Sequence, residues 1–254
     1  MAVWGVVNQK GGVGKTTTSV NLGYALAQLG QRVLLIDADP QGNATTGLGV
    51  EKTSLGPTLF DLLVAAADQP ICPQTAIISV ADRLDLIPAT LDLAGAEPVL
   101  MGAVGKELML REAIEAVRGD YDWILIDAPP SLGLLTVNVL AACDQVLVPM
   151  QCEFYALEGL SQLLKTQELV RKRVNPGLEI GKVVLTMYDT RNRLTEQVAN
   201  EVRAFFGDKV ARTTIPRNVR LSEAPGFGEP AVKRYPESKG AQAYFDLARE
   251  VSAP

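Results

Sequence analysis

The sequence predicts an α/β protein with a doubly wound, mostly parallel β-sheet and helices on both faces. Short, continuously apolar segments alternate along the chain with longer amphipathic ones. Continuous apolarity is typical of strands covered on both faces, and regular alternation with helices is typical of parallel sheets. The strands are expected at 2–8, 32–37, 121–127, 144–150 and 182–187, and the helices at 15–29, 107–117, 131–142, 155–174, 193–206 and 239–251.

Length and composition limit the class of protein. The 254 residues, 47% of them hydrophobic, suit one large α/β domain over 1–254, or two small ones, with a substantial core. No apolar run reaches the ~18 residues of a membrane span, and the N-terminal "MAVWGVVNQ" lacks the basic region of a signal peptide. Three cysteines without metal-ligand spacing indicate a reduced, cytoplasmic protein. The absence of histidine excludes Ser-His-Asp and Cys-His catalysis and histidine-ligated metals.

The net charge of −5 is unevenly distributed along the chain. Residues 1–180 hold 12 Lys and Arg against 20 Asp and Glu, whereas residues 181–240 hold 11 against 7. The C-terminal excess of positive charge indicates either an ordinary solvated surface or a local basic face for a polyanion.

A glycine-rich loop joins the first strand to the first helix. It lies within "NQKGGVGKTTTSVNL", residues 8–22, and ends in Gly-Lys-Thr. Backbone N–H groups of such a loop can surround phosphate oxygens, and the following helix start favours negative charge. Lys15 is then expected to reach the β- and γ-phosphates, Thr16 to offer its hydroxyl to Mg²⁺, and Thr17 to contact the α-phosphate. The backbone contacts are assigned to Gly11, Gly12, Val13 and Gly14.

The loop departs from the standard phosphate-loop pattern, because Gln9 stands where its first glycine belongs. The sequence "KGGVGKT" resembles the deviant Walker A motif of the ParA/MinD family of ATPases. Further stretches resemble the chromosomal ParA, or Soj, branch, and together they cover nearly the whole chain. These stretches are "LLIDADPQGNAT" (34–45), "ILIDAPPSLGLLTVNVLAACDQVLVP" (124–149), "CEFYALEGL" (152–160) and "IPRNVRLSEAP" (215–225).

The resemblance gives the second lysine of the loop a role. In the family, the residue matching Lys10 crosses a dimer interface to the partner's phosphates. A cation supplied from a second chain would stabilise charge on the terminal phosphate as its bond breaks. The alternative is that Lys10 is a solvated surface lysine.

Three aspartates follow strands at the edge of the sheet where α/β proteins bind ligands. Alternation along the strand places Asp37 and Asp39 on the same side, and Asp127 closes a second strand. The resemblance implies that Asp39 positions or activates the attacking water and that Asp37 supports the magnesium shell. Asp127 resembles a Walker B aspartate, which holds Mg²⁺ through water. The alternatives are an Asp-Pro turn at a strand end for Asp37 and Asp39, and an ordinary aspartate that closes a strand for Asp127.

Two further sites are expected in the C-terminal third. Met187, Pro216 and Asn218 are candidates for framing adenine, or else simply pack. Arg191, Arg217 and Arg220 match positions at which the Soj branch binds DNA without sequence preference. Guanidinium groups suit phosphate oxygens, so backbone contacts with strong salt dependence are expected. The alternative is that these arginines pair with Glu196, Glu201 or Glu223.

The resemblance therefore implies a slow, Mg²⁺-dependent ATPase for segregating chromosomes or plasmids. It implies an ATP-bound homodimer, nonspecific double-stranded DNA, a ParB-type activator protein, no membrane, and a cytoplasmic, nucleoid-associated location. Three other functions remain open: a membrane-docking ATPase like MinD, an electron-transfer protein like the nitrogenase iron protein, and a scaffold with an inactive nucleotide site. Residues 154–160 either touch the activator or only pack.

Overall fold

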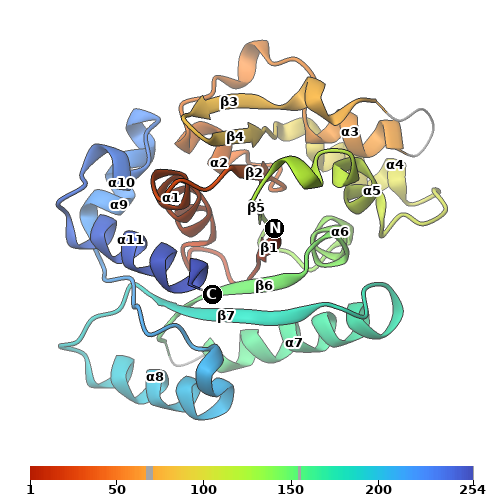
Figure 1. Cartoon of the computed structure of the whole chain (residues 1–254). Helices are drawn as coiled ribbons and strands as arrows, with labels where there is room; N and C mark the ends of the chain where they lie inside the picture. The colour runs from red at the N-terminus through yellow and green to blue at the C-terminus, as the bar shows by residue number, and fades with distance from the viewer. Residues whose placement is uncertain (67–70, 154–155, 254) are drawn as a thin grey trace.

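The computed structural model describes residues 1–66, 71–153 and 156–253, and its strands form one sheet in the order β3-β4-β2-β5-β1-β6-β7 (Figure 1). Five strands confirm the sequence prediction: β1 (Ala2–Val6), β2 (Val33–Asp37), β5 (Trp123–Asp127), β6 (Gln145–Gln151) and β7 (Glu179–Thr186). The other two, β3 (Ile78–Ala81) and β4 (Leu84–Ile87), were not expected. They pair antiparallel, and every other pair is parallel.

The register of the sheet brings acidic side chains together. Strand β5 lies between β2 and β1, with Asp37 directly opposite Asp127, and Asp127 opposite Val6. The chain leaves β1 at Val6 and enters the glycine loop. Because the strands are parallel, the carboxyl ends of β1, β2 and β5 meet at one edge of the sheet, where ligands of open α/β folds bind.

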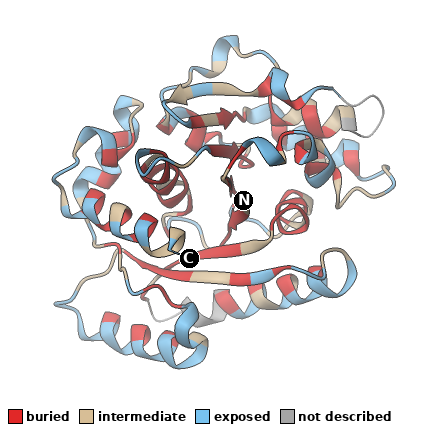
Figure 2. Ribbon diagram, in the orientation of Figure 1, coloured by how far each residue is buried: buried red, intermediate tan, exposed pale blue. Residues whose placement is uncertain are grey.

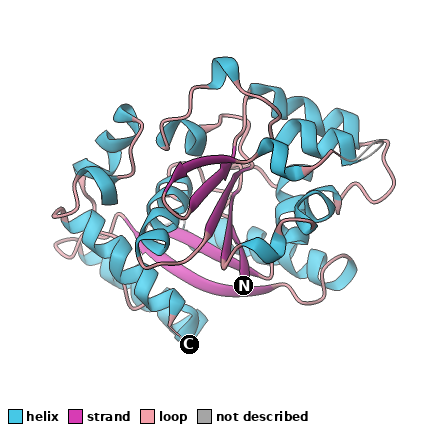
Figure 3. Cartoon of the chain, turned by 45° about the horizontal axis from the view of Figure 1, so that its top comes forward, coloured by secondary structure: helices cyan, strands magenta, loops and turns pink. Residues whose placement is uncertain are grey.

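Helices surround the sheet, and Figure 3 shows the strands enclosed between them. The six expected helices are confirmed within a few residues at each end: α1 (Lys15–Gln28), α5 (Met109–Glu115), α6 (Leu134–Ala142), α7 (Ala156–Arg173), α8 (Arg193–Phe206) and α11 (Lys239–Ser252). Within the described residues, five further helices were not in that prediction: α2 (Asn43–Gly47), α3 (Leu59–Ala66), α4 (Ala96–Leu100), α9 (Val219–Glu223) and α10 (Ala231–Arg234).

Two hydrophobic layers confirm the doubly wound arrangement. One layer packs α1 and α11 against one face of the sheet, and the other packs α3, α5, α6, α7 and α8 against the opposite face. Figure 2 shows the central strands buried between them. Trp4 and Trp123 lie edge to face, with ring centres 5.2 Å apart, in the first layer. Each fully buried leucine contributes about 1.5–3 kcal/mol.

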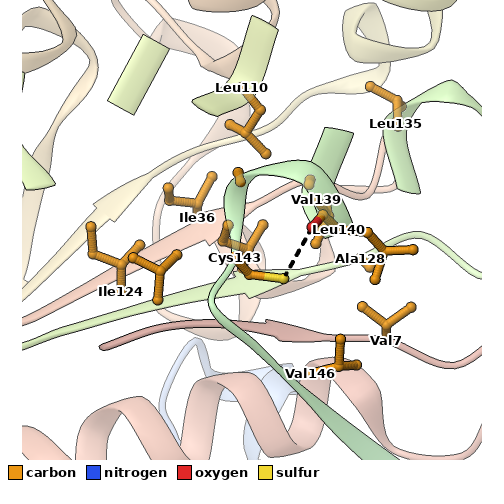
Figure 4. Packing of buried hydrophobic residues seen from close by; sticks show 14 of the residues in the cluster. Val7, Ile36, Leu110, Ile124, Ala128, Leu135, Val139, Leu140, Cys143 and Val146 are labelled. Carbon is orange, nitrogen blue, oxygen red and sulfur yellow. Dashed lines mark hydrogen bonds between the residues drawn. The ribbon is translucent and has the colours of Figure 1, made fainter. Parts of the chain in front are cut away.

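The packing of α6 against β1 brings the second layer close to the start of the glycine loop. A Cβ atom on Gly5 would lie 2.9 Å from Val139 and 3.2 Å from the sulfur of Cys143, so only glycine allows this approach. Cys143 is buried among aliphatic side chains, and its thiol points to the carbonyl oxygen of Leu140 (Figure 4). Burial raises the pKa of this thiol to about 12, so Cys143 behaves as a small apolar residue.

A second close approach joins two loops that are far apart in sequence. Gly49 follows α2, and Gly228 follows the short 3-10 helix η6 (Ala224–Phe227). Both have positive φ, +79° and +64°, and a Cβ atom on Gly49 would lie 2.8 Å from the carbonyl oxygen of Gly228. The loop that leads away from Asp39 therefore rests directly on the C-terminal loop that carries η6.

Candidate functional site

The glycine loop forms an open cradle at the start of α1. Gly12 and Gly14 have φ values of +75° and +85°, which glycine adopts without strain. Cβ atoms on Gly11 and Gly12 would meet nothing within 4 Å, so the mouth of the loop is open. No side chain caps the helix start at Gly14, which leaves backbone N–H groups of the first turn for an anion. Thr186 fixes the loop on the sheet by donating to the carbonyl of Val13 at 2.8 Å.

Lys15 is held inside this cradle. Its side chain is buried, and its ammonium donates to the carbonyl oxygen of Lys10 at 3.2 Å. Burial lowers the pKa of Lys15, although the nearby charges of Asp127 and Asp39 act in the opposite direction. The sheet edge therefore holds one lysine among carboxylates, directly below the open loop.

Thr16 and Asp127 meet as the sequence predicts. The hydroxyl of Thr16 donates to Asp127 Oδ2 at 2.7 Å, and Ser19 donates to Asp127 Oδ1 at 2.8 Å. The sequence analysis missed Ser19, although it stands four residues after Lys15 on the same helix face. Burial, and then the neighbouring charge of Asp37, raise the pKa of Asp127.

Asp37 is completely buried and anchors helix α2. Its Oδ2 accepts from both the backbone N–H and the hydroxyl of Thr45, each at 2.8 Å, while Oδ1 accepts from the N–H of Asp39 at 3.3 Å. Burial raises the pKa of Asp37 above its usual range. Thr45, which the sequence analysis did not single out, thereby joins the end of β2 to the loop beyond Asp39.

Asp39 lies beside this pair, as expected from strand alternation. It is 7% exposed, and its Oδ1 accepts from the backbone N–H of Gln41 at 3.0 Å. Together with Thr16, Asp37 and Asp127 it gives the sheet edge a set of hydroxyl and carboxylate oxygens. Mg²⁺ prefers such hard oxygen donors and takes only one or two carboxylates alongside phosphate oxygens, so the residues fit this ion.

Lys10 is paired within its own chain. Its ammonium forms an ion pair with Glu153, just beyond β6 in the same chain, with side-chain exposures of 39% and 47%. Half-exposed ion pairs of this kind are weak and easily exchanged for a stronger anion. The sequence gives no signal for the pair, because 143 residues separate its two members.

A cavity of about 210 Å³ lies next to the glycine loop. Met187, Pro216 and Asn218, the three candidates for an adenine pocket, all line it, together with Thr17. Met187 has φ of +49°, a conformation that costs a non-glycine residue energy and is typical of functional sites. Tyr244, missed by the sequence analysis, closes the cavity and shares a 3.0 Å hydrogen bond with Thr18.

Comparisons with known proteins place this geometry in a family. Residues 1–180 match the family model described as an AAA domain. The chain is 56% identical over 249 residues to the sporulation initiation inhibitor protein Soj of Bacillus subtilis, covering 98% of this chain and 97% of that protein. It is also 56% identical to the chromosome partitioning protein ParA of Caulobacter vibrioides over 253 residues, covering 99% and 94%. The chain belongs to the ParA/Soj family of partitioning ATPases.

A solved structure agrees with the family fold. The crystal structure of cobyrinic acid a,c-diamide synthase from Mycobacterium smegmatis, with bound ATP analogue and magnesium, superposes with a TM-score of 0.84. It is 38% identical and covers 98% of this chain and 93% of that one. Within the described residues, no helix is long and apolar enough to cross a membrane.

The three arginines of the predicted DNA face lie on the C-terminal side of this ParA/Soj-type site. Arg191 and Arg217 line one cleft of about 530 Å³, together with acidic residues. Arg191 is 88% exposed and bonds Asp189 through two nitrogens, at 3.0 and 2.9 Å, which lowers the pKa of Asp189. Arg220, on α9, pairs with Glu223 at 2.7 Å, one of the acidic partners the sequence suggested.

The structure describes only part of the 154–160 stretch that was considered for contact with an activator. Residues 154 and 155, the first two of the 154–160 stretch considered for an activator, lie outside the described residues. Leu160, the last of that stretch, is buried in the hydrophobic layer below the sheet, so this end of the stretch packs.

Proposed function

We propose that residues 1–254 act as one ATP-hydrolysing unit of a chromosome- or plasmid-partitioning system, with Mg²⁺ and ATP as ligands. One observation carries the proposal: an open glycine loop, the buried Lys15 and the three aspartates meet at a single sheet edge. The bound ATP analogue and magnesium of the 38% identical structure support the same ligands here.

The nucleotide would bind with its phosphates in the cradle and its base in the adjoining cavity. Backbone N–H groups of residues 11–14 and of the α1 start surround the β-phosphate. Lys15 then exchanges the carbonyl of Lys10 for phosphate oxygens, and Thr17 contacts the α-phosphate. Met187, Pro216 and Asn218 frame the adenine, since all three line the cavity beside Thr17.

Thr16, Asp37 and Asp127 would hold the magnesium ion. When bound, the ion neutralises charge on the β- and γ-phosphate oxygens. Asp39 orients a water molecule toward the γ-phosphorus, and the reaction releases ADP and phosphate. Lys15 stabilises the charge that develops on the terminal phosphate. Basal hydrolysis is expected to be slow, because the chain has no histidine to act as a base near neutral pH.

The second lysine supplies the reason for dimerisation. In the ATP-bound homodimer, Lys10 leaves Glu153 and inserts between the partner's phosphates. The exchange is favourable because a terminal phosphate carries more charge than the half-exposed carboxylate that Lys10 contacts in the single chain. ATP thereby selects one of two states, and hydrolysis removes the bias.

The dimer would bind double-stranded DNA without sequence preference and associate with the nucleoid in the cytoplasm. Arg191, Arg217 and Arg220 contact the sugar-phosphate backbone. A ParB-type activator would complete the hydrolytic site and release the DNA. The acidic balance of residues 1–180 is complementary to a basic activator segment.

The Asp39→Ala variant tests the cycle. It should keep ATP but lower the hydrolysis rate by about 100-fold or more, since a water-orienting carboxylate contributes that much. Sedimentation velocity with Mg²⁺ and ATP should then find a long-lived dimer that stays on DNA. Asp82→Ala, which removes an exposed carboxylate in the turn between β3 and β4, at the opposite edge of the sheet, serves as the control and should hydrolyse normally. Single chains in the ATP-saturated Asp39→Ala sample would reject the proposed dimer.

Arg191→Ala and Arg220→Ala test the DNA face. Each should weaken binding by the same factor on unrelated duplexes and make the plot of log affinity against log salt shallower by about 0.9. Basal ATPase activity should be unchanged. Arg32→Ala removes an equal charge at the opposite edge of the sheet, where Arg32 bonds Asp122, and should bind DNA normally. Undiminished binding of the two variants at moderate salt would show that the face lies elsewhere.

A further inference from the structure

Two arginines in the C-terminal region stack on aromatic rings. The guanidinium carbon of Arg220 lies 4.8 Å from the ring centre of Tyr235, and that of Arg234 lies 5.6 Å from the same centre. Arg234 also lies 3.6 Å from the ring centre of Phe227. We name these four residues the arginine–aromatic cluster. Its members come from α9, the end of η6 and the end of α10, so the fold brings them together around Tyr235.

Hydrogen bonds fix the orientation of both guanidinium groups. Arg234 Nε donates to the hydroxyl of Tyr235 at 3.3 Å, and Arg234 Nη1 donates to Glu229 at 2.9 Å. Arg220 Nη1 donates to Glu223 at 2.7 Å. A guanidinium carries five N–H donors, more than these contacts use, so each arginine keeps donors for a further acceptor.

The ion pairs of the cluster do little to stabilise the fold. The side chains of Arg220 and Arg234 are 54% and 32% exposed, and exposed ion pairs contribute little to folding. Ordering two long side chains also costs conformational entropy. Arginine side chains that are already ordered in the free protein lose less conformational entropy when they bind a ligand. In a binding site, the entropy cost of ordering them during folding is therefore offset by tighter binding.

The chemistry of the cluster points to phosphate groups in a row. Both guanidinium groups lie beside the ring of Tyr235 and are therefore held close to each other. Because the phosphates of a DNA strand are also closely spaced, the two groups can contact neighbouring phosphates. Lys233, whose ammonium contacts Glu229 at 3.0 Å, adds a third positive charge on α10. Glu223 and Glu229 act as internal counterions, which a stronger and doubly bonding phosphate can displace.

We propose that Arg220 and Arg234 form one composite site for the phosphate backbone of double-stranded DNA, and that Tyr235 is the positioning residue that holds both arginines. This inference rests on the proposed DNA-binding function and extends it by one arginine and by the ring between them. Tyr235 contacts no phosphate itself. Its contribution is to restrict both arginines to the rotamers that face the ligand.

The test measures DNA affinity in the Asp39→Ala background saturated with Mg²⁺ and ATP. Fluorescence anisotropy on two unrelated duplexes over a series of salt concentrations gives both the affinity and its salt slope. Tyr235→Leu should bind about tenfold more weakly with a nearly unchanged slope, because it removes two cation–π contacts and no charge. Tyr235→Phe keeps the ring and loses only the 3.3 Å hydrogen bond from Arg234 Nε, so it should stay within about twofold of its parent. Arg234→Gln should lower both the affinity and the slope, the latter by about 0.9.

Phe205→Leu is the matched control, since Phe205 is an aromatic residue that is 67% exposed on α8, outside the cluster. Parental affinity in Tyr235→Leu would overturn the positioning role, and a Tyr235→Phe variant as weak as Tyr235→Leu would overturn the role of the ring in it. Because the Tyr235 ring also packs against the hydrophobic layer around α11, Tyr235→Leu must keep its melting temperature and its ATP-bound dimer. If Tyr235→Leu loses either property, the DNA affinity of Arg234→Gln alone tests the composite site. Unchanged DNA binding by Arg234→Gln would overturn that site. If Arg191→Ala and Arg220→Ala also bind normally, the proposed DNA face itself fails.

Discussion

Lys15→Ala is expected to abolish nucleotide binding, with a loss in affinity of about 100-fold or more. Lys15 is buried below the loop, and its only hydrogen bond to a described residue is to a backbone carbonyl, so its ammonium is available to phosphate oxygens. Removing it would leave the triphosphate beside Asp39 and Asp127 without the cation that compensates them, and an unpaired buried charge costs about 3–5 kcal/mol. Isothermal titration with ATP and Mg²⁺ measures the effect directly.

Lys10→Ala provides the control for this result. It removes the same charge from the same loop, but the ammonium of Lys10 lies against Glu153 rather than inside the cradle. We expect Lys10→Ala to bind ATP nearly normally as a single chain and to fail only in dimerisation. Tight ATP binding by Lys15→Ala would contradict the assignment of the cradle to phosphate.

Gly11→Val is expected to bind ATP and yet stay monomeric. A Cβ atom at Gly11 meets nothing within 4 Å in its own chain, and its φ is not positive, so valine costs the single chain little. The loop mouth would face the second chain in the proposed dimer, where two added methyl groups would keep the surfaces apart. Sedimentation in the Asp39→Ala background, with Mg²⁺ and ATP, should show the loss of the dimer.

Gly119→Val is the matched substitution, because Gly119 also has open space at its Cβ position but lies just before β5, at the opposite edge of the sheet. It should dimerise like its parent. A dimer formed by Gly11→Val would contradict the geometry in which the two loops face each other.

The sequence predicted the central strands and the long helices better than the edge strands and the short helices. The continuous apolarity of the central strands and the amphipathic periodicity of the long helices are both visible in the sequence, and these elements were confirmed. Strands β3 and β4 were missed because each has only four residues and β3 is mostly half-exposed at the edge of the sheet. Helix α3 was missed because it has only eight residues, with a Gly-Pro pair just before it. Such elements depend on packing more than on their own sequence.

The candidate site was predictable where motifs end strands or begin helices. Thr16 meets Asp127, and Asp37 lies opposite Asp127, because parallel register follows from the fold. The partners that orient these groups were not predictable. Thr45, which fixes Asp37, carries no signal beyond being a threonine. Glu153, which holds Lys10, is brought near only by the folded sheet.

The contact between Gly49 and Gly228 has a mechanical consequence. With backbone meeting backbone and no side chain between them, the two loops have no compressible layer to absorb a displacement. In the proposed cycle, a shift that begins at the γ-phosphate and passes through Asp37, Thr45 and α2 would therefore push or release the segment that bears Phe227. If the proposed function holds, loss of the γ-phosphate and release of DNA would be a single movement within one subunit, ahead of any separation of the two.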